Sequence, residues 1–147
     1  MKKVVVLFIS TIILGSFFAS CTKEDNGPVD MSLIEGKWLF SRSTVTSNGI
    51  TLPYSNPNLK NGEGCPKDFI EILSGAIVKN GDYSLNCVFS GKDGTWTQSG
   101  NAISIQFNGS GDDETFNVTT LTATELVLKI NGTYEGLSGT LNMYFTK

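Results

Sequence analysis

Few side chains in this sequence are suited to catalysis. Its 147 residues include no His, which removes His-based acid–base chemistry, His-activated nucleophiles and most transition-metal sites. Asp68 and Glu71 are residue types that glycosidases use in pairs, but no pattern in the sequence brings a chosen pair of carboxylates together. The composition therefore favours a non-enzymatic protein without a metal or a cofactor.

Cys65 and Cys87 are the two cysteines that follow Cys21. Two cysteines in an exported chain usually pair, and the midpoint of this pair lies beside the turn-forming residues Ser74 and Gly75. A nucleophilic thiol would lack a His partner. We therefore predict a structural disulfide between Cys65 and Cys87, with a stabilisation of about 3 kcal/mol.

Arg42 is the only Arg in the sequence. In an extended strand it would lie on the same face as Trp38 and Phe40. If that face is internal, Arg42 could bind a ligand carboxylate as a bidentate pair. The favoured alternative is that the strand ends or bends there and Arg42 faces water. The acidic run 112–114 could offer oxygens to Ca²⁺, but it lacks the spacing of an EF-hand, so a solvated hairpin loop is favoured.

Residues 1–20 have the pattern of a secretory signal peptide. A basic start at Lys2 and Lys3 precedes an apolar run that is too short to span a bilayer, which takes about 20 residues. Ala19 and Ser20 before Cys21 resemble a bacterial lipobox, in which the Cys becomes the new N-terminus and carries lipid, such as palmitate. The alternative is an ordinary cleaved signal peptide with an incidental Cys.

Residues 21–32 then form a polar tether with Gly and Pro. Its Lys23-Glu24-Asp25 resembles the export signal of surface lipoproteins in the Bacteroidetes, although a charged linker explains it equally well. We expect a protein anchored to the outer membrane by lipid, facing either the cell surface or the periplasm. The formal net charge of −3 argues against a nucleic-acid partner, and we expect a monomer.

From residue 33 onward, short alternating segments are separated by Gly, Asn and Asp turns. This spacing indicates an all-β sandwich or barrel, and sequential hairpins favour a small up-and-down antiparallel barrel of about eight strands. The long loop 53–64 contains two prolines and is expected to flank the open end. The predicted strands are 36–47, with a brief return at 50–52, then 67–73, 76–79, 83–90, 95–98, 102–107, 114–121, 125–130 and 137–145.

Several weak motifs occur in a recognisable order. Gly36-x-Trp38 opens the first strand, Cys65-Pro66-Lys67-Asp68 opens the next, Cys87 follows, and Gly94-Thr95-Trp96 precedes a Gly-Asn turn. This order resembles the lipocalin-like domain of bacterial lipoproteins over residues 33–147. The resemblance implies a lipocalin-like barrel that binds a small hydrophobic ligand. Lipocalins proper also cover this Trp with an Arg near the C-terminus, which this sequence lacks.

Two functions remain open. The first is ligand binding inside the barrel, for which a cavity of ~300 Å³ or more would be evidence. The second is a surface module that contacts a protein or glycan through its loops, with a filled core and an exposed aromatic patch. An eight-stranded barrel can either fill itself or hold one small ligand. The candidate ligand-binding residues are Phe40, Arg42, Trp96, Phe107, Phe116 and Met143.

Overall fold

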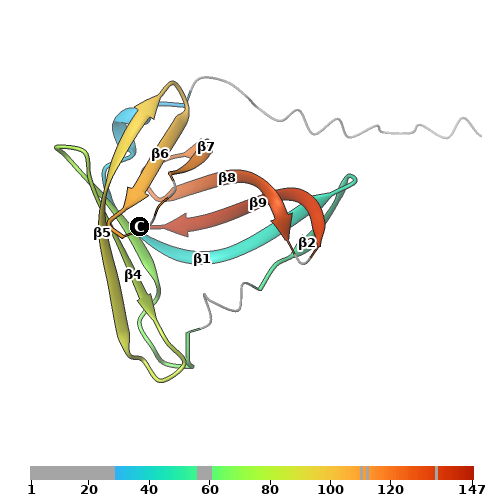
Figure 1. Ribbon diagram of the computed structural model, residues 1–147, viewed down its shortest axis with the longest axis horizontal. Coiled ribbons are helices and arrows are strands. Elements are labelled where there is room, and N and C mark those ends of the chain that lie inside the picture. Colours follow the sequence, from blue (N-terminus) through green and yellow to red (C-terminus); the bar gives the residue numbers. More distant parts are fainter. Residues whose placement is uncertain (1–28, 56–60, 110, 112, 135) are drawn as a thin grey trace, which may run out of the picture.

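The computed structural model describes residues 29–55, 61–109, 111, 113–134 and 136–147. The predicted signal peptide and Cys21 lie outside these residues. A short 3-10 helix is followed by nine strands (Figure 1). The elements are η1 (Met31–Leu33), β1 (Gly36–Ser47), β2 (Ile50–Pro53), β3 (Phe69–Leu73), β4 (Ile77–Tyr83), β5 (Phe89–Ser99), β6 (Ala102–Phe107), β7 (Glu114–Leu121), β8 (Glu125–Tyr134) and β9 (Leu137–Thr146).

The strands form a closed antiparallel barrel. Their order is β2-β1-β3-β4-β5-β6-β7-β8-β9, and β1 also pairs with β9, so eight strands close the sheet while β2 extends from β1. β3 pairs with β1, and each strand from β4 onward pairs with its predecessor, because short turns connect them. The predicted up-and-down barrel is confirmed. Within the described residues, no helix has the length and apolar character needed to cross a membrane.

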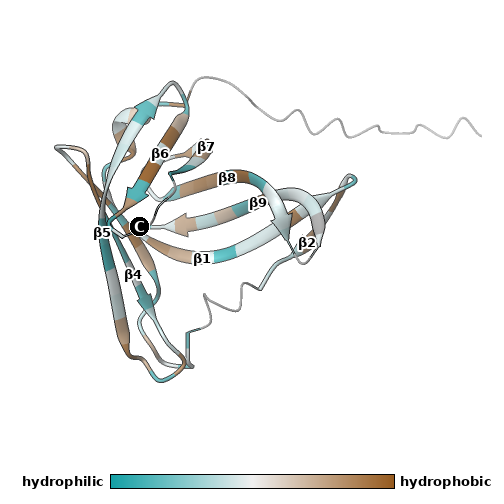
Figure 2. Ribbon diagram, viewed as in Figure 1, coloured by the Kyte–Doolittle hydropathy of each residue, from teal (hydrophilic) through white to brown (hydrophobic). Residues whose placement is uncertain are grey.

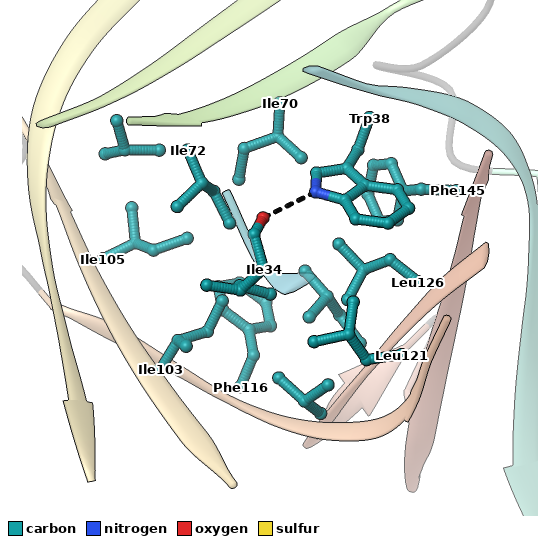
Figure 3. Close-up of a cluster of buried hydrophobic side chains, with 13 residues drawn as sticks. Ile34, Trp38, Ile70, Ile72, Ile103, Ile105, Phe116, Leu121, Leu126 and Phe145 are labelled. Atoms are coloured by element: carbon teal, nitrogen blue, oxygen red, sulfur yellow. Dashed lines mark hydrogen bonds between the residues drawn. The ribbon is translucent and has the colours of Figure 1, made fainter. Parts of the chain in front are cut away.

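One end of the barrel is closed by η1 and the residue after it. Ile34 is buried beneath the strands, and the indole N–H of Trp38 donates a hydrogen bond of 2.8 Å to the Ile34 carbonyl (Figure 3). Val29 and Met31 also pack against the core, so the packed structure includes the last residues of the predicted tether. The sequence motif around Trp38 therefore fixes a plug in this end of the barrel.

Lys147 covers the outside of this plug. Its Nζ lies 4.1 Å from the centroid of the Trp38 ring and donates to the Glu35 carbonyl at 3.0 Å. Lys147 thus covers Trp38 in the way expected of an Arg near the C-terminus in lipocalins proper. Gly36 leaves the necessary room, since a Cβ on this residue would lie 2.9 Å from the Lys147 Cε.

The closed half of the barrel is filled with apolar side chains. Alternation along the strands directs them inward, and the largest of them are almost completely removed from water (Figure 3). These fully buried side chains are Ile34, Trp38, Ile72, Val78, Ile103, Ile105, Leu126 and Leu128.

Three predicted turns are instead parts of strands. Residues 80–82 lie within β4, 91–94 within β5 and 131–132 within β8, and the observed turn between β4 and β5 spans residues 84–88. The predicted strand 83–90 is therefore wrong. Leu85 and Phe89, which fall in that predicted strand, are 65% and 55% exposed.

Close packing explains why glycines occur inside these strands. A Cβ on Gly81 would lie 2.2 Å from the Phe69 ring, and one on Gly94 would lie 2.2 Å from the Gln106 carbonyl oxygen. Glycine within a strand often marks such a close approach rather than a turn. The local residue types alone do not distinguish the two cases.

Candidate ligand-binding cavity

A cavity of about 370 Å³ occupies the half of the barrel opposite η1. β1 pairs with β3 only from Gly36 to Leu39, and from Thr44 onward it pairs with β2 instead. The sheet therefore separates between β1 and β3, and Figure 1 shows β1 and the β4–β5 hairpin diverging from the closed end. The side chains leave this part of the barrel unfilled.

Apolar side chains supply most of the cavity wall. They come from β1, β3, β6, β7, β8 and β9, and Figure 2 shows the hydrophobic stretches along β6 and β8. The Phe40 and Phe145 rings meet edge to face, with centroids 5.7 Å apart. The apolar wall consists of Phe40, Phe69, Ile70, Ile105, Phe107, Phe116, Leu128, Ile130, Leu141, Met143 and Phe145.

Four of the six candidate ligand-binding residues line this cavity: Phe40, Phe107, Phe116 and Met143. Trp96 does not. Its indole N–H donates to the Leu73 carbonyl at 3.0 Å, and the side chain packs against the core. Trp96 therefore has a structural position in the closed half.

Arg42 also lies outside the cavity. Phe40 is opposite Phe145 on β9 but Arg42 is opposite Tyr144, so Ser41 forms a β-bulge in β1. A bulge shifts the alternation of the strand by one residue. Arg42 consequently faces outward, with its guanidinium carbon 3.5 Å from the centroid of the Tyr144 ring. The favoured alternative, that the strand bends there and Arg42 faces water, agrees with this position.

Asp68 and Asp82 place two carboxyl groups in the cavity wall. Asp68 is only 4% exposed and accepts a hydrogen bond of 2.7 Å from the Tyr83 amide. The Asn80 side-chain amide donates to Asp82 at 2.9 Å. Burial raises the pKa of Asp82 above its usual value, and the neighbouring Asp68 raises it further, whereas Asn80 and Lys92 act in the opposite direction.

Glu114 and Tyr134 complete the polar part of the wall. The Tyr134 hydroxyl donates to the Ile130 carbonyl at 3.2 Å, and its ring meets that of Tyr54 edge to face at 5.7 Å. Burial raises the pKa of Tyr134, with smaller contributions from Tyr54 and Glu114. Glu114 begins β7, as the predicted strand 114–121 implies, and lies on the same face as Phe116.

The predicted disulfide between Cys65 and Cys87 is present. It joins the segment before β3 to the turn between β4 and β5, at the end of the barrel where the cavity lies. The bond thus ties a long connection to the wall that carries Asp82. Among the described residues, no group of three His, Cys, Asp or Glu side chains could hold a metal ion.

Aromatic rings also gather on the outside of β3, β4 and β5. The Phe69 and Phe89 rings stack with centroids 6.4 Å apart, and Tyr83 lies 5.3 Å from Phe89. Beyond them, Leu85 and Val88 in the β4–β5 turn are each 65% exposed. The end of this hairpin is accordingly hydrophobic in Figure 2. We call Phe69, Tyr83 and Phe89 the outer aromatic cluster.

A family model described as a lipocalin-like domain matches residues 34–128. The chain belongs to this lipocalin-like family. The match begins at the Ile34 plug and runs through most of the barrel, including the walls that carry Asp68, Asp82 and Glu114. Lipocalin-like families consist in general of non-enzymatic binding proteins. Among curated proteins, none matches the chain.

Solved structures with the same fold come from bacteria and from an animal. A lipocalin-like protein from Bacteroides uniformis is 18% identical, with a TM-score of 0.53 over 78% of this chain and 98% of its own. A protein from Bacteroides eggerthii is 15% identical, with a TM-score of 0.50 over 77% and 98%. Lobster apocrustacyanin A1 is 13% identical, with a TM-score of 0.52 over 80% and 62%. At these identities the likeness concerns the lipocalin-like fold alone.

Proposed function

We propose that this protein is a cell-envelope lipoprotein that binds a small hydrophobic molecule inside its barrel and catalyses no reaction. The observation that carries the proposal is the apolar cavity of about 370 Å³. This volume lies within the range of small-molecule sites, about 300–1,000 Å³, and the mixture of an apolar wall with a few polar groups is typical of them.

The test is titration of the purified barrel with N-phenyl-1-naphthylamine, a neutral apolar dye, together with native mass spectrometry for a co-purifying molecule. Met143→Trp should fill the cavity and weaken dye binding at least tenfold. Thr97→Trp, at an exposed position on β5, is the matched control and should bind as the wild type does. A wild-type barrel that binds no dye and carries no molecule would contradict the proposal.

Membrane attachment through Cys21 is the second part of the proposal. Cys21 follows Ala19 and Ser20 as in a lipobox, and several acyl chains would anchor the protein more firmly than one. Seven residues lie between Cys21 and Val29, so the two are at most about 28 Å apart when the segment is extended. Since Val29 packs at the core beside the closed end, the cavity would open away from an outer membrane held by this anchor.

Cys21→Ala should move the protein from the membrane fraction to the soluble fraction of cells. A matched Ser20→Ala variant should remain in the membrane fraction, because it keeps the small residue that a lipobox requires. Unchanged fractionation of Cys21→Ala would rule out the anchor and would leave the cavity proposal intact.

A surface interaction module is the second candidate, and the outer aromatic cluster favours it. Stacked aromatic rings with apolar neighbours are common in binding surfaces. If this surface binds a glycan, Phe89→Ser should abolish binding on a glycan array and should leave dye binding in the cavity unchanged. Equal glycan binding by the wild type and the Phe89→Ser variant, or no glycan binding by the wild type, would exclude this second function.

A further inference from the structure

We infer that the cavity prefers an amphiphile with a positively charged head group over a fatty acid of the same chain length. The inference rests on the proposed ligand-binding function and specifies its ligand class. It comes from the charges in the cavity wall, which are arranged beside a largely apolar surface.

All the charged side chains that line the cavity are acidic. They are Asp68, Asp82 and Glu114, which come from three different parts of the chain, and among the described residues no Lys or Arg lines the cavity. Arg42, the cation expected there from the sequence, lies outside the barrel against Tyr144. A ligand carboxylate would therefore meet like charges without a basic partner.

The environment of two of these carboxyl groups strengthens the preference. Asp68 is 4% exposed, with the Tyr83 amide as its donor, and Asp82 is close enough to Asp68 for their charges to interact. Two ionised carboxyl groups in a partly desolvated wall repel one another, and the repulsion is stronger there than in water. An ammonium group placed between them would offset this repulsion with two attractions.

Two Lys side chains lie near this wall: the charge of Lys92 on β5 acts on Asp82, and the Lys37 Nζ lies 3.7 Å from the centroid of the Phe69 ring, which lines the cavity. Lys92 is exposed, lies opposite Asn80 in the register and does not line the cavity. Its charge offsets part of the acidic field. Three acidic groups in the wall against two exposed Lys that do not line the cavity still leave the wall negative.

The apolar part of the ligand would lie against the apolar wall of the cavity. The apolar wall surrounds the cavity toward the core, where Phe116, Leu128 and Phe145 are buried. Glu114 and Asp82 are more exposed and lie at the cavity end of β7 and β4. A chain inserted into the barrel would therefore hold its head group at the acidic residues.

The experiment compares three ligands with the same ten-carbon chain: decyltrimethylammonium, decanol and decanoate. Each is used below its micelle-forming concentration to displace N-phenyl-1-naphthylamine at pH 7 and low ionic strength. We expect the cation to bind at least tenfold more tightly than decanoate, equivalent to about 1.4 kcal/mol, with decanol between them. High salt should reduce the difference.

Variants assign the preference to the cavity wall. Asp82→Asn combined with Glu114→Gln should reduce the ratio of cation to decanoate affinity at least threefold. Lys92→Ala should increase the ratio. Asp93→Asn, at an exposed position next to Lys92, is the matched control and should leave the ratio unchanged.

The outcomes separate this inference from the proposed function. Equal or tighter binding of decanoate, or a ratio that the cavity variants do not change, would overturn the charge preference while ligand binding stands. Failure of the dye and all three ligands to bind the wild type would overturn both.

Discussion

Replacing Trp38 by Phe should destabilise the protein strongly, because Trp38 joins the first strand to the plug of the barrel. The side chain is 0% exposed, and its indole N–H donates to the buried Ile34 carbonyl at 2.8 Å. Phe retains an aromatic ring beneath Lys147 but has no N–H. The substitution therefore removes the hydrogen bond and part of the packing while it keeps the apolar character.

The structure sets the size of this effect. A buried carbonyl that loses its partner costs about 1–3 kcal/mol. The space left by the smaller ring adds about 1–2 kcal/mol, because a closely packed core relaxes only in part. We therefore expect a loss of about 2–5 kcal/mol in the free energy of unfolding. At a urea dependence of about 1–3 kcal/mol per molar, the midpoint should fall by at least about 0.7 M.

Trp96→Phe is the matched control, since Trp96 also donates its indole N–H to a backbone carbonyl. That bond, to Leu73 at 3.0 Å, is only partly buried, so water can replace the lost donor. We expect a loss of about 1 kcal/mol, measured for both variants by far-ultraviolet circular dichroism in urea. Equal losses in Trp38→Phe and Trp96→Phe would refute the plug as the source of the larger effect.

Two further predictions concern the cavity end of the barrel. The double variant Cys65→Ser, Cys87→Ser removes a bond across a sequence separation of 22 residues and should lower the free energy of unfolding by about 3 kcal/mol in urea; a loss below about 1 kcal/mol would contradict the chain-entropy argument. Because the pKa of Asp82 is raised above 3.8 in the folded protein, its ionisation weakens the fold as pH rises through that range. Asp82→Asn should therefore melt at a higher temperature than the wild type at pH 7, with the gain vanishing below about pH 4, and a gain independent of pH would exclude ionisation as its cause.

Much of the barrel could be predicted because apolar and polar residues alternate along its strands, in agreement with the inward and outward directions that the side chains take in the structure. β1, β6 and β7 begin and end where the sequence pattern predicts. Errors arose where turn-type residues occur within strands, as at Gly81 and Gly94, whose backbones are approached by Phe69 and by β6. Such contacts depend on the neighbouring strand, so the residue types within a strand do not reveal them.

The cavity was predictable in its apolar part and not in its charge. Phe107 and Phe116 follow the alternation of their strands, and both line the cavity. Asp82 was missed because residues 80–82 were assigned to a turn. In the structure β4 continues to Tyr83, and Asp82 lies on the same face of this strand as Val78 and Asn80. Arg42 was a candidate only because the bulge at Ser41 leaves no signal in the sequence.

The two possibilities for the interior, a filled core or a cavity, are realised in different halves of one barrel. Trp38, Ile34 and their neighbours fill the closed half, where side chains are almost fully buried. Phe40, Phe107, Ile130 and Met143 line the other half and remain only partly buried. Since the cost of a substitution grows with the buried contact that it removes, changes around the cavity should disturb stability less than changes at the plug. This separation allows ligand preference to vary while the closed end maintains the fold.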